Sequence, residues 1–316
     1  MSTKMDYSRL PRAASSTVSV GVGVCAHNEE RNISKLLGVL TSISLFETIT
    51  IVSSGSTDAT DQIVRERCLV DPRVQLIVEK DRGGKTSAIN TLIERCHCDI
   101  LVFVSADTIP TASGVLSLLR QFDDPNVAAA SGRPIPVNPK KGFGITTHIM
   151  WAAHWNFLWN LSKRGKLAHI SGEMCAITSR VMRNIPRDII NEDAYIALTA
   201  ALMGFRSVFD PNAIVYMKAP SNVIELFEQR RRVIAGHKQV FVRTGLMPTV
   251  LPISWFKHPT AFVKTSASIL RQFRFKTFFW ASILLTCEFA AFMATTRFAR
   301  GLVYPWKPIP STKTVQ

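Results

Sequence analysis

Asp107 has both the residue type and the position to hold a metal ion. It ends the run Asp99-Ile-Leu-Val-Phe-Val-Ser-Ala-Asp107, whose apolar middle is typical of a buried strand. Open α/β sheets bind ligands in the crevice above the carboxyl ends of their parallel strands, where an aspartate can ligate a cation. The same pattern also fits an aspartate that caps the next helix. Asp107 alone leaves both interpretations open.

Three further polar clusters each follow an apolar run. Asn28-Glu29-Glu30 and Ser53-Ser54-Gly55-Ser56-Thr57-Asp58 offer carboxylates, amides and hydroxyls that can bind a nucleoside. Gly83-Gly84-Lys85 brings backbone amides and a positive charge to a helix start, a combination suited to phosphate. Each cluster could instead be an ordinary loop and helix cap. The earlier glycine of a Walker A motif is absent, which argues against a P-loop kinase or ATPase.

Two charged groups in the second half of the chain could complete such a site. Asn191-Glu192-Asp193 sets two carboxylates side by side, and repulsion from Glu192 would raise the pKa of Asp193. The same acids also suit a helix N-terminus. Gln229-Arg230-Arg231-Arg232 lies on a predicted helix whose basic face could simply be solvated or face lipid. Of its three arginines, we expect only Arg232 to point inward.

Alternating strands and helices must position the first four clusters. After a polar tail over 1–17, strands are predicted at 18–25, 48–53, 74–78 and 100–104, with helices near 33–45, 60–68 and 85–96. This βαβαβαβ order predicts a parallel, doubly wound sheet. We expect one α/β catalytic domain over 18–245, with a nucleotide-binding half at 18–135 and an acceptor half at 136–245.

The alternation ends after residue 135. Trp151, Trp155, Phe157 and Trp159 gather on one predicted helix. Such a helix could lie at a lipid interface, where tryptophan is favoured, or could be an aromatic-rich core helix. Both interpretations stay open.

The charge balance points to an anionic partner. The 316 residues include 38 Lys and Arg against 23 Asp and Glu, a formal net charge of +15. Many basic residues after 225 lie among apolar sequence, which fits a membrane surface better than nucleic acid. The six cysteines form no Cys-x-x-Cys pair and are predicted to be buried, reduced thiols. The N-terminus lacks an apolar signal core, so we expect chemistry on the cytosolic side.

Residues 246–316 are predicted to form a membrane-associated region. Its helix at 277–296 carries Glu288 as the only charge, and at 1.5 Å per residue it would cover roughly 30 Å. A carboxyl group near the bilayer centre is costly unless it is paired or protonated. A single transmembrane span is the favoured prediction, while an in-plane or re-entrant helix and a soluble core helix remain open.

In order and spacing, these clusters resemble the family 2 glycosyltransferases of the GT-A fold, the group that includes cellulose, chitin and hyaluronan synthases. The resemblance runs from Val20 to Val240, and its second half consists of Ser131-Gly-Arg-Pro134, Ser171-Gly-Glu-Met-Cys-Ala-Ile, Asn191-Glu192-Asp193, Gly204-Phe-Arg and Gln229-Arg-Arg-Arg232-Val. The chain departs from the family at Ser53 and Ser54, where acids are frequent, at Ser105, where Asp-x-Asp is common, and at Val233, where tryptophan is usual. Asp107 would therefore be a single metal carboxylate in place of two.

The resemblance implies a nucleotide-diphosphate sugar donor, with a UDP-sugar as the first guess, and a divalent cation, Mg²⁺ or Mn²⁺, held by Asp107. It assigns donor binding to Asn28, Glu29, Asp58, Lys85, Asp107, Gln229 and Arg232. Asp193, with Glu192 beside it, would be the general base of an inverting transfer to a hydroxyl group. The acceptor would be lipid-linked or a glycan, and the enzyme would sit at the membrane, single-pass or monotopic, with its catalytic domain facing the cytoplasm.

Other functions remain open at this point. Sugar nucleotidyltransferases use a similar platform but usually have a glycine-rich N-terminal loop, whereas the glycines of Val20-Gly-Val-Gly-Val24 lie within a predicted strand. The serines at 53, 54 and 105 and Val233 would suit a catalytically inactive, membrane-associated protein that binds nucleotide sugars. Charge alone favours nucleic acid, and we do not expect a nucleic-acid partner.

Overall fold

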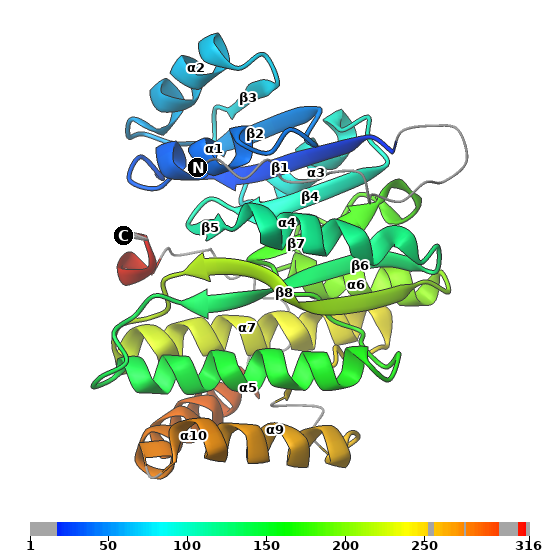
Figure 1. Cartoon of the computed structure of the whole chain (residues 1–316). Helices are drawn as coiled ribbons and strands as arrows, with labels where there is room; N and C mark the ends of the chain where they lie inside the picture. The colour runs from blue at the N-terminus through cyan, green and yellow to red at the C-terminus, as the bar shows by residue number, and fades with distance from the viewer. Residues whose placement is uncertain (1–17, 252–255, 275, 297–308, 314–316) are drawn as a thin grey trace, which may run out of the picture.

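A computed structural model of the chain describes residues 18–251, 256–274, 276–296 and 309–313. One eight-stranded sheet in the order β3-β2-β1-β4-β7-β6-β8-β5 forms its centre (Figure 1). Strands β1 (Val20–Ala26), β2 (Thr48–Ser54), β3 (Val74–Glu79) and β4 (Ile100–Ser105) are parallel neighbours. Helices α1 (Ile33–Thr41), α2 (Thr60–Val70) and α3 (Lys85–Arg95) connect them. The predicted parallel βαβαβαβ half is confirmed, while the predicted tail at 1–17 lies outside the described residues.

Side chains alternate between two cores on the faces of the sheet. On one face, Val22 and Val24 of β1 pack with Leu36 and Leu40 of α1. On the other, β4 residues pack against α3, and Gly23 of β1 faces the same helix. A Cβ at Gly23 would come within 2.8 Å of the Leu92 side chain, so glycine lets α3 lie close to the sheet. Both glycines of Val20-Gly-Val-Gly-Val24, Gly21 and Gly23, therefore lie within strand β1 and do not form a phosphate-binding loop.

The second half of the sheet is mixed in direction. It contains β5 (Thr108–Pro110), β6 (Val127–Pro136), β7 (Met174–Thr178) and β8 (Arg206–Met217), together with helices α4 (Ala112–Leu119) and α6 (Glu192–Leu202) and the short 3-10 turns Arg120–Asp123, Ser179–Val181 and Pro310–Thr312. Strand β7 is antiparallel to both β4 and β6. Because β7 runs opposite to β4, the residues just before β7 lie beside the end of β4.

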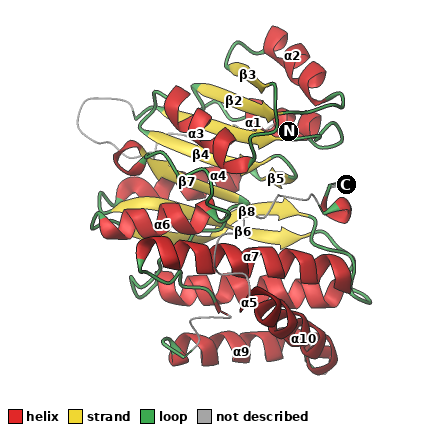
Figure 2. Cartoon of the chain, turned by 180° about the vertical axis from the view of Figure 1, so that it is seen from behind, coloured by secondary structure: helices red, strands yellow, loops and turns green. Residues whose placement is uncertain are grey.

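Four longer helices lie on the side of β6 and β8 (Figures 1 and 2): α5 (Gly144–Ser162), α7 (Val223–Thr244), α9 (Pro259–Phe273) and α10 (Lys276–Thr296). Helix α5 packs on β6 and β8 and is covered by α9 and α10. Trp151 is 8% exposed and Phe157 is fully buried. The tryptophan-rich helix is thus a core helix and does not form the outer surface.

Helix α10 is one helix of the described chain that is long and apolar enough to cross a membrane, over Phe278–Thr295; a single helix of this kind is weak support for a span. Its carboxylate, Glu288, forms an ion pair with Arg230 of α7, with Nε and Oε1 2.5 Å apart. Leu285 and Phe289 are each 67% exposed. One face of α10 is therefore tied to the domain while another presents apolar side chains. The basic residues predicted to follow it, Arg297 and Arg300, lie outside the described residues.

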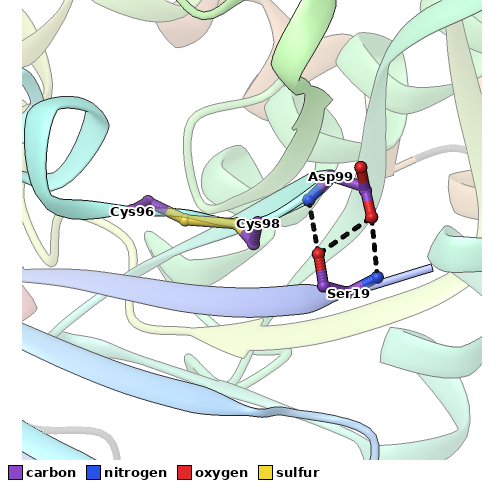
Figure 3. The surroundings of a disulfide bond; sticks show 4 residues. All are labelled: Ser19, Cys96, Cys98 and Asp99. Atoms are coloured by element: carbon purple, nitrogen blue, oxygen red, sulfur yellow. Dashed lines mark hydrogen bonds between the residues drawn. A yellow bond between two sulfur atoms is a disulfide. The ribbon is translucent and has the colours of Figure 1, made fainter. Parts of the chain in front are cut away.

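The prediction of reduced thiols is wrong for two of the six cysteines. Cys96 and Cys98 form a disulfide in the link between α3 and β4 (Figure 3). Ser19 and Asp99 join the same region, since the Ser19 hydroxyl donates to Asp99 Oδ2 at 2.8 Å and the Asp99 N–H donates back to the Ser19 oxygen at 2.9 Å. The disulfide lies where β1 and β4 begin, so it is on the opposite side of the sheet from the carboxyl ends of these two strands. The sequence pattern missed it because only one residue separates the two cysteines.

Candidate active site

A cavity of about 810 Å³ opens at the edge of the sheet where β1, β2 and β4 end. Seven of the nine predicted site residues line it: Glu29, Lys85, Asp107, Glu192, Asp193, Gln229 and Arg232. They come from the strand ends of the first half and from helices α6 and α7 of the second half. The fold thus brings together groups that lie far apart in the sequence.

Asn28 and Asp58 do not line this cavity. The Asn28 Oδ1 atom accepts a hydrogen bond from the Thr57 N–H at 2.8 Å, and Asn28 has a φ of 54°. Asp58 accepts hydrogen bonds from the backbone N–H groups of Glu30, at 3.1 Å, and Thr60, at 3.0 Å. Both side chains join the loop after β1 to the loop after β2. Their role in donor binding stays a prediction.

The serines that depart from the family pattern make defined contacts. Ser54, at the end of β2, accepts a hydrogen bond from the Gly83 N–H at 3.0 Å and so ties β2 to the loop before α3. Ser105, at the end of β4, donates to the Gly172 carbonyl at 3.0 Å. In both places a hydroxyl holds neighbouring segments together at the cavity edge.

A short segment near the C-terminus closes one side of the cavity. The Lys313 ammonium forms an ion pair with the Glu29 carboxylate and donates to the His27 carbonyl at 3.1 Å. Asn32 donates to the Lys313 carbonyl at 2.8 Å. Burial and the nearby charge of Asp107 raise the pKa of Glu29, and Lys313 opposes that shift. The sequence analysis did not identify Lys313, since no pattern links it to a residue 284 positions away.

Lys85 and Glu192, which both line the cavity, form an ion pair. Burial alone would lower the pKa of Lys85, but the charges of Glu192 and Asp193 outweigh it and the pKa rises. The pKa of Asp193 is also raised, and burial is the main cause. The predicted cause was repulsion by Glu192; that carboxylate is instead neutralised by Lys85. A partly buried carboxyl with a raised pKa is suited to accept a proton.

Glu173 is a further carboxylate of the cavity that the sequence analysis did not single out, although its motif Ser171-Gly172-Glu173 was part of the resemblance. Burial raises the pKa of Glu173 to about 7, while a hydrogen bond from the Ser171 hydroxyl, 2.6 Å long, opposes the shift. A Cβ built at Gly172 would lie 3.0 Å from Asp193 Oδ2 and 3.5 Å from Lys85 Nζ. Glycine at 172 therefore lets the segment before β7 pass close to both groups.

Two arginines of α7 face the cavity, where one was expected. Burial lowers the pKa of Arg232, and the charges of Glu192, Asp107 and Asp193 counteract that shift, so Arg232 lies among the carboxylates. Arg230 also lines the cavity and pairs with Glu288. Arg231 instead pairs with Glu228, which is about half exposed. Since residues 230 and 232 are two apart on a helix, they reach different parts of the cavity.

The residues fit a divalent cation that is held mainly by phosphate oxygens of a bound substrate and by water, with one carboxylate from the protein. The described residues contain no group of three His, Cys, Asp or Glu that could hold a metal ion by themselves. Asp107 offers a partly buried carboxylate after β4, and desolvation raises its pKa against the charges of Lys313 and Lys85. Mg²⁺ in particular is commonly bound by one or two carboxylates together with phosphate oxygens and water.

The mixed sheet, with Asp107 after its fourth strand and acids of α6 facing the same cavity, has the GT-A fold. The family model "Glycosyl transferase family 2" matches residues 21–185, and the chain belongs to that family. It is an enzyme of the glycosyltransferase class, as predicted, and the nucleotidyltransferase alternative is set aside.

Solved structures that share this fold include two glycosyltransferase complexes. The mannosyltransferase PcManGT from Pyrobaculum calidifontis, in complex with GDP-Man and Mn²⁺, has a TM-score of 0.60 at 20% identity, over 90% of this chain and 85% of that chain. Glucosyl-3-phosphoglycerate synthase from Mycobacterium tuberculosis, in complex with Mn²⁺, UDP and phosphoglyceric acid, has a TM-score of 0.52 at 18% identity, over 73% of this chain and 80% of that chain.

The chain is also similar in sequence to poly-beta-1,6-N-acetyl-D-glucosamine synthases. That of Staphylococcus aureus (strain COL) is 26% identical over 204 residues, which cover 62% of this chain and 48% of the relative. That of Staphylococcus epidermidis is 24% identical over 226 residues, 70% of this chain and 55% of the relative. The chain spans about half the length of the curated relatives it matches.

Proposed function

We propose that the protein transfers a sugar from a nucleotide-diphosphate donor to a hydroxyl group of a membrane-proximal acceptor, with inversion at the anomeric carbon. The observation that carries the proposal is that Asp107, Lys85, Arg232 and Asp193 line one cavity. A UDP-sugar is the first donor to test. Because the matched relatives are named as synthases of an N-acetylglucosamine polymer, UDP-N-acetylglucosamine heads the series.

The proposed reaction is a single displacement. The acceptor oxygen attacks the anomeric carbon while the bond from that carbon to the diphosphate oxygen breaks. The electron pair of that bond leaves with the nucleoside diphosphate, and the hydroxyl proton passes to a carboxylate oxygen of Asp193. Attack opposite to the leaving group inverts the configuration.

Positive charge stabilises the leaving group. Arg232 and Lys85 would face the diphosphate, with Gln229 beside them, and Glu29 would contact the nucleoside end. A divalent cation, when bound, would neutralise part of the developing charge, and Asp107 would hold it. Lys85 also stays paired with Glu192, which leaves Asp193 available for the acceptor proton.

We also propose that the catalytic domain works at the cytoplasmic surface of a membrane. The support is the exposed apolar face of α10 and the basic residues Lys264 and Arg271 on the adjacent α9. The Arg230–Glu288 ion pair favours α10 lying against the domain in the membrane plane over a single span. Flotation with phosphatidylglycerol vesicles, followed by alkaline carbonate extraction, tests this: a span would resist the extraction.

The function is tested with detergent-purified protein and a panel of nucleotide sugars, with and without Mn²⁺. We expect nucleoside diphosphate release that depends on the cation, and a product of inverted configuration. Asp193→Asn should abolish transfer and leave donor binding intact. A product of retained configuration, or full activity in Asp193→Asn, would overturn the mechanism; a protein that binds donors but releases no product with any acceptor would favour an inactive binding protein.

A further inference from the structure

One part of the cavity is lined by three imidazoles and an indole that contact one another. Trp151 and His154 come from α5, His169 from the segment before β7, and His237 from α7. The ring of His169 lies edge-on to both other imidazoles, with centroids 5.8 Å from His154 and 5.5 Å from His237. Trp151 lies 5.4 Å from His154 in the same arrangement. We refer to these four residues as the aromatic compartment.

The aromatic compartment lies next to the catalytic carboxylate. Asn191, two residues before Asp193, donates hydrogen bonds to His237 Nδ1 and to the Val233 carbonyl, each 2.9 Å long. A Cβ at Gly236 would come within 2.4 Å of Asn191 Oδ1, so glycine is needed for this contact. The compartment therefore adjoins the segment that carries Asp193, and both line the same cavity.

Two polar atoms in this compartment are buried without a hydrogen-bond partner among the described residues: Trp151 Nε1 and His169 Nδ1. Trp151 is 8% exposed and His169 is 4% exposed. An unpaired buried polar atom costs free energy, and a ligand hydroxyl beside it would remove that cost. A hydroxyl can both donate and accept, so the hydroxyls of a ligand can satisfy an indole N–H as well as an imidazole nitrogen.

The compartment offers no surplus of positive charge. Burial lowers the pKa of His169 to about 4 and holds the pKa values of His154 and His237 well below the usual range, so the imidazoles are neutral at pH 7. Arg230, whose charge adds to these shifts, is already paired with Glu288. A phosphate would require unpaired cations or several aligned N–H groups. A neutral ring with several hydroxyls fits these walls better, since aromatic faces can pack against its C–H groups.

Beyond the aromatic compartment, the cavity has an apolar wall. Phe262 of α9 and Leu285, Phe289 and Phe292 of α10 line it, and all four also reach the outer surface, with exposed fractions of 38% to 67%. An apolar chain attached to a sugar could therefore continue from the compartment to the surface proposed to face the membrane.

We propose that Trp151, His154, His169 and His237 form an acceptor subsite for an uncharged sugar carried on a lipid, and that lipid phosphates are not the acceptor. This inference rests on the proposed function and specifies its acceptor class. The acceptor hydroxyl reaches Asp193 from the aromatic compartment, while the lipid chain lies along α9 and α10.

The test compares two acceptors with the same donor and cation: an octyl β-hexopyranoside and a short-chain polyprenyl phosphate. We expect transfer to the glycoside and at least 10-fold less to the phosphate. Trp151→Phe and His169→Gln should each raise the KM for the glycoside about 10-fold, with the donor Kd unchanged. Trp159→Phe is the matched control, because Trp159 lies on the same helix and does not line the cavity.

Preferred transfer to the polyprenyl phosphate, or an unchanged glycoside KM in both variants, would overturn the acceptor subsite while leaving the transferase function in place. An unchanged donor Kd shows that a variant is folded. If the wild-type protein neither binds nor hydrolyses any donor, the proposed function fails first and the acceptor inference fails with it.

Discussion

Lys85, the first residue of α3, forms an ion pair with Glu192, the first residue of α6. The pair joins the first half of the chain, which carries the strand-end clusters, to the half that contains Asp193. The Glu192 side chain is 6% exposed and that of Lys85 is 23% exposed. Removal of the Lys85 charge therefore leaves the buried Glu192 carboxylate without its ion-pair partner.

Lys85→Met should lower the free energy of unfolding by about 3 kcal/mol, because it leaves Glu192 and Asp193 buried together. The double variant Lys85→Met with Glu192→Met should recover most of that loss but should not recover transfer. Urea unfolding and a transfer assay measure the two effects. If the stability losses of the two single changes simply added in the double variant, the ion pair would not be the cause.

The raised pKa of Glu173 should make stability depend on pH. A carboxyl whose pKa is higher in the folded state than its usual 4.5 binds its proton more tightly when folded. Its contribution is therefore full below about pH 4.5 and is lost as the pH rises through about 7. Glu173→Gln keeps the shape of the neutral acid and cannot ionise.

Urea unfolding of wild type and Glu173→Gln across pH 5 to 8 should show the wild type losing stability relative to the variant by up to about 3 kcal/mol. The difference between the two proteins removes the contribution of the other titrating groups. If the unfolding free energies of the two proteins changed in parallel from pH 5 to 8, Glu173 would ionise as an ordinary surface acid does.

The Glu29–Lys313 contact should hold the C-terminal segment at the cavity. Glu29→Gln removes the charge that binds the Lys313 ammonium, so the segment at 309–313 should be released more often. Limited trypsin digestion should then cleave after Lys313 several-fold faster. Glu30→Gln is the matched control, because the Glu30 carboxylate instead accepts a hydrogen bond from the Ala59 N–H at 3.1 Å. Equal cleavage rates in the two variants would count against the contact.

The Arg230–Glu288 pair should anchor α10 to α7. Both side chains are about 15% exposed, so Arg230→Met should lower the free energy of unfolding by about 3 kcal/mol. Arg231 pairs with Glu228 near the surface, and Arg231→Met should cost less than about 1 kcal/mol. Thermal or urea unfolding of both variants in detergent measures the two stability losses. Similar losses of unfolding free energy in the two variants would show that the Arg230–Glu288 pair stabilises the fold no more than the Arg231–Glu228 pair does.

Much of the first half was predictable from local pattern. The strands that end before Glu29 and Asp107 are short apolar runs between amphipathic helices, and a buried parallel sheet requires that alternation. Once the strands are parallel and adjacent, their carboxyl ends lie at one edge, so the polar clusters after them meet without any further information. Lys85 at the start of α3 follows from the same rule.

The second half was predictable only through the resemblance. Nothing local in Ser171-Gly172-Glu173 indicates that this segment precedes an antiparallel strand beside β4, which is what brings Glu173 to the site. The inward orientation of both Arg230 and Arg232 likewise depends on α10 supplying Glu288 on one side and the carboxylates of the site lying on the other.

By itself, the sequence determined the α/β order, the strand-end position of Asp107 and the family resemblance, because these depend on residues close together in the chain. The tertiary structure decided the partners: Lys313 with Glu29, Glu192 with Lys85, and His169 between two other imidazoles. Burial shifts the pKa values of Asp193, Glu173 and His169, and burial exists only once distant segments pack together. The chemistry of the site therefore arises from packing that no local pattern encodes.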